Sequence, residues 1–239
     1  MTKFIALFGL DASEIKENCI LLPLLPKGIL AELKVDSLAK GKLFCSGNSA
    51  EYTIIQTGMG AAFTADAVLY LKETACKNII LFGSCGLVHK NTGLDIGSLV
   101  VPSKCWENES FSELLIDKFK KNKAFYPDTD LMTVLLNVGQ RTGVKEVSCA
   151  TLGSLKLEEQ MQDLLIKEQI DVVEMECSAF FAAAKYCELK AAALFYVSDI
   201  ISEKPFYFEM EQELKTKIAS SIKSAAKIIC ESFKKSFSA

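Results

Sequence analysis

Acidic residues follow two apolar segments of this chain at the points where each segment ends. Ile170–Met175 runs into Glu176, and Ala192–Val197 is followed one residue later by Asp199. An alanine-rich stretch with aromatic side chains separates them and predicts a helix over Ser178–Leu189. Strand, helix and strand make a βαβ unit, and open α/β sheets bind ligands at the carboxyl ends of their strands. Because burying an unpaired charge is costly, both carboxylates are candidates for contact with a substrate.

The rest of the chain alternates short apolar segments with longer amphipathic ones, which predicts a three-layer α/β architecture. There is no repeat and no linker rich in glycine, proline or serine, so residues 1–239 are expected to form a single domain. The predicted strands are Phe4–Phe8, Lys42–Cys45, Tyr52–Thr57, Asn78–Phe82, Ser98–Val101, Val144–Cys149, Ile170–Met175 and Ala192–Val197. The predicted helices are Ala61–Lys72, Leu114–Lys121, Asp130–Thr142, Leu157–Glu168, Ser178–Leu189 and Phe208–Phe233.

Composition narrows the class of protein. Half of the 239 residues are hydrophobic, and a formal net charge of −3 without long like-charge blocks argues against nucleic-acid or membrane partners. No apolar run is long enough for a membrane span. Nine scattered cysteines without a CxxC pair are typical of reduced thiols in a cytoplasmic protein. With a single histidine, His89, a multi-histidine metal site is hard to build, so we expect no metal and no cofactor.

Glycine turns follow three predicted strands, at Gly9, at Gly58–Gly60 and at Gly83–Gly86. Glycine lets the backbone approach a ligand closely, so turns of this kind can line a shared pocket. None of them matches the GxGxxG or Walker pattern, which argues against a dinucleotide or nucleoside triphosphate site.

Three ordered motifs resemble those of the nucleoside phosphorylase-I superfamily. Gly83–Gly86 with Leu94–Pro102 resembles its GS-x-G…L-x-IGD-x-VV signature, Val173–Ala179 its VEMEA-x-A motif, and Val197–Asp199 its VSD motif. The resemblance extends from about Lys3 to the last predicted helix. It implies a three-layer sandwich in which helices flank a central twisted mixed β-sheet. It also implies cleavage of the N-glycosidic bond of a purine nucleoside.

The resemblance also assigns roles to side chains. Glu176 would accept hydrogen bonds from the ribose hydroxyls, a task that suits an acceptor-only carboxylate. Asp199 would protonate or hydrogen-bond N7 of the purine, which requires a raised pKa. Glu174 is expected to support or cap the site. The residues expected to line the pocket are Met59, Ser84, Gly86, Met175 and Ser198, with Phe206 or Phe208 covering the base or the 5′ substituent.

The nucleophile divides the superfamily, because phosphorylases hold phosphate with arginines whereas nucleosidases activate a water. The single arginine, Arg141, lies away from every motif, and Leu81 stands where many phosphorylases carry arginine. Leu7–Ile15 resembles the IIGAMEEEV segment of methylthioadenosine/S-adenosylhomocysteine nucleosidases, which implies that Glu14 is the base that activates water. Hydrolysis is therefore the expected reaction, with these nucleosidases the nearest in pattern.

Two departures from the nucleosidase pattern leave the base and the 5′ group open. Phe195 replaces the usual arginine, and Leu152 stands where an aromatic stacks on adenine, although the backbone of Gly153 could still read the base edge. Two other hypotheses therefore stay open: a phosphorylase with an unusual phosphate site that includes Ser84, and a catalytically silent nucleoside-binding protein. The resemblance further implies a homo-oligomer, with a dimer favoured.

Overall fold

The computed structural model describes residues 2–90, 93–117 and 123–235. Its core is a ten-stranded mixed sheet in the order β10-β6-β8-β9-β5-β1-β4-β3-β2, with β7 paired to β6. The strands are β1 Asn18–Leu22, β2 Ala39–Lys40, β3 Cys45–Asn48, β4 Thr53–Gln56, β5 Asn78–Leu87, β6 Leu99–Asn108, β7 Ala124–Phe125, β8 Lys145–Leu152, β9 Val172–Glu174 and β10 Lys190–Ile200. The helices are α1 Lys3–Phe8, α2 Ile29–Glu32, α3 Ala61–Leu71, α4 Phe111–Asp117, α5 Thr129–Gly139, α6 Leu155–Lys167, α7 Cys177–Cys187 and α8 Gln212–Lys235, with short 3-10 turns η1 Ala12–Glu14 and η3 Gln140–Thr142.

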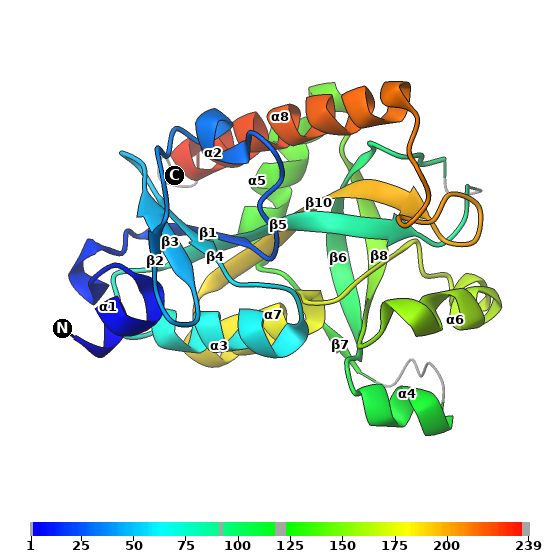
Figure 1. Cartoon of the computed structure of the whole chain (residues 1–239), viewed down its shortest axis with the longest axis horizontal. Helices are drawn as coiled ribbons and strands as arrows, with labels where there is room; N and C mark the ends of the chain where they lie inside the picture. Colours follow the sequence, from blue (N-terminus) through cyan, green and yellow to red (C-terminus); the bar gives the residue numbers. More distant parts are fainter. Residues whose placement is uncertain (1, 91–92, 118–122, 236–239) are drawn as a thin grey trace.

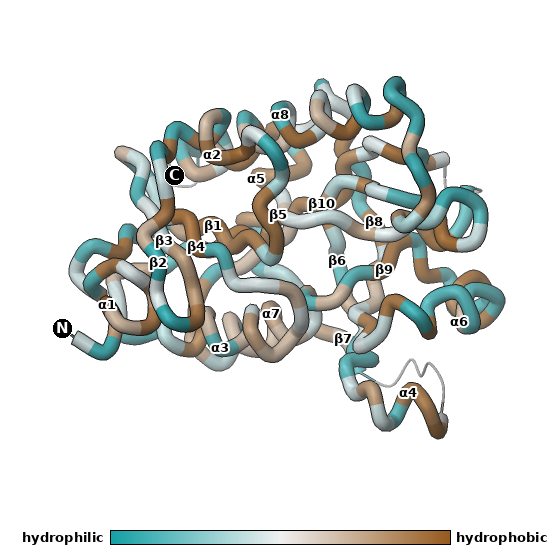
Figure 2. Tube along the Cα trace, viewed as in Figure 1, coloured by the Kyte–Doolittle hydropathy of each residue, from teal (hydrophilic) through white to brown (hydrophobic). Residues whose placement is uncertain are grey.

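Helices cover both faces of the sheet, so the predicted three-layer sandwich is confirmed. The long helix α8 packs with α2 and α5 over one face, and α3 and α7 pack together over the other (Figure 1). Hydrophobic residues gather along the central strands, while hydrophilic and hydrophobic residues alternate along α8 (Figure 2). This alternation explains how α8 buries one stripe, including Ile222, Ala226 and Ile229, and exposes the other.

Part of the sheet closes on itself. Strand β5 runs parallel to β10 and antiparallel to β9, and the pairings β10–β6, β6–β8 and β8–β9 complete a ring of five strands. On its other side β5 pairs in parallel with β1, which pairs in parallel with β4. The carboxyl ends of β1, β5 and β10 therefore meet at one edge of the sheet.

The predicted first strand, Phe4–Phe8, is wrong, because this segment forms helix α1. Thr2 Oγ1 accepts the N–H of Ile5 at 3.2 Å and caps the start, and Gly9 ends the helix with a φ of 81°. The rings of Phe4 and Phe8, one helical turn apart, stack with centroids separated by 4.4 Å. Both side chains are thus buried by a helical spacing, not by alternation along a strand.

The first strand is instead β1, which the sequence analysis did not predict. All five of its residues are buried. The prediction for Lys42–Cys45 is also wrong for most of its length, because only Cys45 belongs to a strand, and the N–H of Lys42 donates to the carbonyl of Ala6 in α1. The other predicted strands and helices are present with shifted ends, except that residues 118–121 of the predicted helix Leu114–Lys121 lie outside the described residues.

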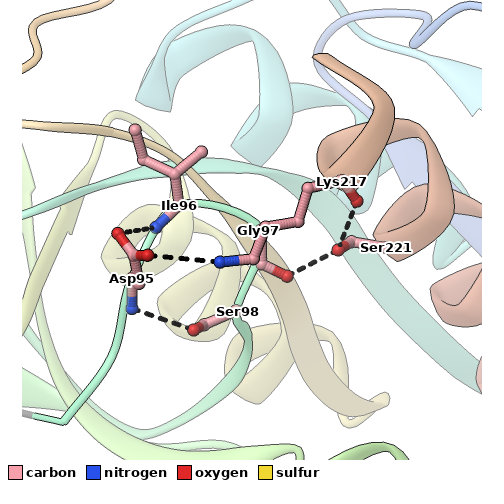
Figure 3. A network of polar contacts seen from close by, with 6 residues as sticks. All are labelled: Asp95, Ile96, Gly97, Ser98, Lys217 and Ser221. Atoms are coloured by element: carbon pink, nitrogen blue, oxygen red, sulfur yellow. Dashed lines mark hydrogen bonds and ion pairs between the residues drawn. The ribbon is translucent and has the colours of Figure 1, made fainter. Parts of the chain in front are cut away.

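A tight turn before β6 attaches the sheet to α8. Asp95 accepts the N–H of Ile96 at 2.8 Å and pairs with Lys217 Nζ at 3.2 Å (Figure 3). Ser221 on α8 donates to the carbonyl of Gly97 at 2.5 Å, and the N–H of Gly97 donates to the carbonyl of Val197 in β10 at 2.8 Å. The contacts of Asp95 and Gly97, which belong to the Leu94–Pro102 motif, therefore hold α8 against β10, the strand that leads to Asp199.

Replacing Gly97 with alanine should destabilise the fold more than the same change at Gly93. Both glycines have positive φ, 84° and 73°, so each substitution carries backbone strain of about 1–2 kcal/mol. A Cβ at Gly97 would also lie 2.8 Å from Cγ of Lys217, whereas a Cβ at Gly93 meets no atom within 4 Å. Urea unfolding of G97A and G93A should show the larger loss for G97A; equal losses would contradict the role given to this turn.

Candidate functional site

A cavity of about 420 Å³ lies at the carboxyl ends of β1, β5 and β10, within the size range of small-molecule sites. Most of the side chains predicted for the pocket line it together: Met59, Ser84, Gly86, Met175, Glu176, Ser198, Asp199 and Phe206. Gly83 and Cys85, from the predicted glycine turn Gly83–Gly86, also line it. The cavity is further lined by residues that the sequence analysis did not propose as substrate contacts: Pro23, Leu24, Pro26, Leu155, Glu158, Val173, Glu174 and Tyr196.

Glu174 and Glu176 lie at the junction of β9 and α7, and both are buried. Oε2 of Glu174 accepts the N–H groups of Glu176 and Cys177 at 2.6 and 2.7 Å, so it satisfies donors at the start of α7. Oε1 of Glu176 accepts the N–H of Gly60, in the turn before α3, at 2.6 Å. Burial raises the pKa of Glu176, and its hydrogen bonds from Gly60 and Met175 oppose the rise.

Asp199 reaches the cavity from a β-bulge. The pairing of β10 with β5 shifts register between Val197 and Asp199, and Asp199 then stands opposite Gly86. A Cβ on Gly86 would lie 3.7 Å from Oδ2 of Asp199, so the glycine leaves room beside the carboxyl. The Ser198 hydroxyl lies 2.6 Å from Oδ1, and burial raises the pKa of Asp199 despite that hydrogen bond.

Glu158 is a fourth buried acid at the cavity, in the first turns of α6 after the N-cap Ser154. Burial, with a smaller contribution from the negative charges of Asp199 and Glu159, raises its pKa to about 8. Within the described residues, no ion pair or hydrogen bond balances this carboxyl. Glu158 is therefore largely protonated at neutral pH and can donate a hydrogen bond into the cavity.

The structure contradicts the predicted placement of Glu14. This residue lies in η1, before the amino end of β1, whereas the cavity lies beyond the carboxyl end of that strand. Its Oε2 accepts the N–H of Asp11 at 2.8 Å in a capping box. The resemblance of Leu7–Ile15 to a strand and its catalytic turn therefore does not hold in three dimensions, because the segment is a helix followed by a 3-10 turn.

Three other predicted contacts also lie outside the cavity lining. Leu152, fully buried at the end of β8, packs in a hydrophobic cluster with Val88 and Met161. The next residue, Gly153, lies against the backbone of Glu109. Phe208 lines a smaller neighbouring hollow between the end of β10 and the start of α8. Phe206 is thus the aromatic residue of this segment that lies at the main cavity.

The residues that the sequence analysis missed have identifiable signals. Pro23, Leu24 and Pro26 follow β1 directly, so recognising that strand would have placed them at the sheet edge. Glu158 stands four residues after Ser154, a helix N-cap, in a segment that follows a strand. An acid in the first turns of such a helix points toward the same edge of the sheet as the strand ends.

The fold and the site together define an α/β protein with a small-molecule cavity formed at strand ends and lined by buried carboxyls. The family model of the phosphorylase superfamily matches residues 11–234, and the chain belongs to this family. No curated protein matches it in sequence.

Solved structures share the fold at low sequence identity. Uridine phosphorylase from Vibrio fischeri superposes with a TM-score of 0.77 at 18% identity, covering 95% of each chain. Purine nucleoside phosphorylase from Toxoplasma gondii gives 0.72 at 16% identity, covering 95% of each chain. The Campylobacter jejuni 5′-methylthioadenosine/S-adenosyl homocysteine nucleosidase gives 0.71 at 17% identity, covering 92% of this chain and 99% of that one. No helix in the described ranges has the length and apolar composition to span a bilayer.

Glu158→Gln should change how stability depends on pH. The pKa of Glu158 is about 8 in the folded protein and near 4.5 when unfolded, so the folded state retains a proton that the unfolded state loses. Its stabilising contribution is present below about pH 4.5 and is lost as pH rises through about 8. At about 1.4 kcal/mol per pKa unit, the wild type should lose up to a few kcal/mol over this range.

Chemical denaturation between pH 5 and 9 measures this effect. E158Q should show a flatter decline of unfolding free energy than the wild type. The control is E159Q, on the neighbouring acid of α6, whose pKa is lowered chiefly by a hydrogen bond from Tyr207 and whose loss should leave the decline in place. A wild-type stability that is constant across this range would show that Glu158 is ionised in the folded state.

Proposed function

We propose that this protein binds a nucleoside in the cavity and cleaves its N-glycosidic bond with water as the nucleophile. The observation that carries the proposal is the composition of the cavity lining. Four carboxyl side chains line the cavity, and no lysine, arginine or histidine does so among the described residues. The four are Glu158, Glu174, Glu176 and Asp199.

This composition suits the chemistry of glycosidic cleavage. Departure of the base leaves an oxocarbenium-like, cationic sugar, which carboxylates stabilise. Phosphate is an anion and binds best to a bidentate cationic fork, which the lining residues lack. The loop after β1 adds only Pro23, Leu24 and Pro26 to the lining, and its Lys27 is exposed outside it. Water is therefore the nucleophile that the cavity favours.

The site residues divide the work between sugar and base. Glu176, fixed by the N–H of Gly60, would accept hydrogen bonds from the ribose hydroxyls, and Met175 would pack on the sugar. Asp199, whose pKa is raised by burial, would hold a proton and donate it to the leaving base. A donor at this position pairs with an acceptor such as N7 of a purine, which supports a purine nucleoside as substrate. Phe206 would cover the base or the 5′ substituent.

A second candidate function, binding without turnover, is favoured by the position of Glu14. The side chain predicted to activate water lies outside the cavity, and the remaining carboxyls have raised pKa values or hold backbone N–H groups. A water molecule would then have to lose its proton to Glu176. If the hydrogen bonds of Glu176 to the ribose hydroxyls prevent it from accepting that proton, the nucleoside binds and its glycosidic bond remains intact.

Conservative variants at the two central acids test the proposed hydrolysis. Release of free base from methylthioadenosine, adenosine and inosine should fall about 100-fold or more in Asp199→Asn and in Glu176→Gln. Glu14→Gln is the matched control: glutamine can still accept the N–H of Asp11, and the rate should stay at the wild-type level. A large loss in E14Q with full activity in D199N would overturn the role assignment.

The same assay without and with phosphate separates the three reactions. Free base and free sugar in both conditions support hydrolysis. A strict requirement for phosphate with sugar 1-phosphate as product identifies a phosphorylase. Saturable binding in calorimetry without any product identifies a nucleoside-binding protein.

The exposed apolar residues at the cavity mouth support a homodimer. Leu24, Met59 and Phe206 line the cavity, yet each is more than half exposed, and Tyr207 and Phe208 extend the apolar surface. Sedimentation should report a dimer, and Phe206→Ser should shift it toward monomer; a wild-type monomer at micromolar concentration would contradict this.

None of the nine cysteines, all in described segments, forms a disulfide, which is compatible with a cytoplasmic location.

A further inference from the structure

Three fully buried cysteines surround the carboxyl of Glu174 under the floor of the cavity. Cys105 lies on β6, Cys149 on β8 and Cys177 at the first position of α7, and each has no exposed surface. Cys105 and Cys149 are direct partners in the register of two parallel strands, which places their side chains next to each other on the same face. Three elements that are far apart in the sequence thus place their cysteine side chains around the same carboxyl group.

The distances in this cluster match those between the ligands of a tetrahedral metal centre. Sγ of Cys105 and Sγ of Cys149 lie 3.7 and 3.9 Å from Oε1 of Glu174, and all three atoms lie within 4.8 Å of one another. With metal–sulfur and metal–oxygen distances of about 2.3 and 2.0 Å, tetrahedral ligands stand about 3.5 Å (sulfur to oxygen) and about 3.8 Å (sulfur to sulfur) apart. The two sulfur–oxygen separations are therefore within a few tenths of an ångström of the values for a site closed around an ion.

The surroundings also meet the requirements of a metal site. Oε2 of Glu174 is held by the N–H groups of Glu176 and Cys177, so the carboxyl has a fixed orientation. The Cys177 thiol stands beside the three ligand atoms and offers a fourth. The Thr151 hydroxyl, 3.1 Å from Sγ of Cys105, donates to Oε1 of Glu174 and accepts the N–H of Ser178. Glu174 also lines the cavity, so the cluster lies directly beneath the surface that an ion would reach first from solvent.

We propose that Cys105, Cys149 and Glu174 bind a thiophilic divalent cation of the zinc type beneath the nucleoside cavity. Two thiolates with one carboxylate form a donor set that zinc accepts and that hard ions such as Mg²⁺ do not prefer. The ion displaces the two thiol protons, which leave to solvent, and two metal–sulfur bonds and one metal–oxygen bond form. No electrons are transferred.

Protonation makes the binding depend on pH. Because cysteine binds a metal as a thiolate, each thiol proton must leave before its metal–sulfur bond forms. Affinity should therefore increase with pH, by up to about 100-fold per pH unit where both thiol protons are displaced.

The competing interpretation is a cluster without metal, in which the thiols only donate hydrogen bonds to Glu174. The sulfur–oxygen distances also fit S–H···O bonds, as they would in a cluster without metal. Titration of the reduced, chelator-treated full chain with Cd²⁺ distinguishes a metal site from such a cluster. We expect one Cd²⁺ per chain, a cadmium–thiolate charge-transfer band in the ultraviolet, the release of two protons, and a higher Tm.

Matched cysteine variants locate the site. Cys105→Ser and Cys149→Ser should each weaken Cd²⁺ binding about 100-fold or more, because each removes a thiolate ligand. Cys19→Ser and Cys187→Ser, buried cysteines outside the cluster, should bind like the wild type. No band in the wild type, or a band that C105S and C149S retain in full, would overturn the proposal.

A measurement on the wild type keeps the proposal falsifiable if the variants do not fold. X-ray absorption of the zinc-loaded full chain should show two sulfur neighbours, with oxygen completing the shell, and a third sulfur if Cys177 supplies the fourth ligand. A shell of nitrogen and oxygen alone would overturn it. Neither experiment uses a nucleoside, so a failure here is separate from a failure of the proposed catalytic function.

Discussion

The buried carboxyl of Glu174 is the interaction on which the site depends. It accepts two N–H groups at the start of α7 and the hydroxyl of Thr151 on β8. In this way one side chain joins the end of β9, the beginning of α7 and a neighbouring strand. Removing it would leave buried donors without partners, at a cost of about 1–3 kcal/mol for each. The position of Glu176 follows from this arrangement, because it is the N-cap residue of the same helix.

Concentrating acids in one cavity has an energetic cost that proton uptake reduces. Burial raises the pKa values of Glu158, Glu176 and Asp199, so part of the charge is neutralised at physiological pH. The cavity can therefore offer hydrogen-bond donors as well as acceptors without a basic residue. The stability of the empty protein and the protonation state needed for catalysis thus depend on the same groups.

Sequence reasoning predicted the parts of the site that local motifs encode. Glu176 and Asp199 follow apolar strands, and both line the cavity. Glu14 was misplaced because Phe4–Phe8 is as apolar as a strand, and only its pairing of Phe4 with Phe8 at helical spacing distinguishes it. The cysteine cluster could not be predicted, because Cys105 and Cys149 are brought together by the register of β6 and β8 and not by any spacing along the chain.

Ring closure through β5 and β10 has a further consequence for how the protein meets other chains. Within the described residues, the path of paired strands has a free end at β2, which is only Ala39 and Lys40, and β7 is equally short. Such short edge strands, one of which carries Lys40, resist the strand-to-strand addition by which sheets aggregate. If copies assemble, as proposed above, their contact would then form through side-chain surfaces, which evolution can alter residue by residue without changing the pairing of the strands.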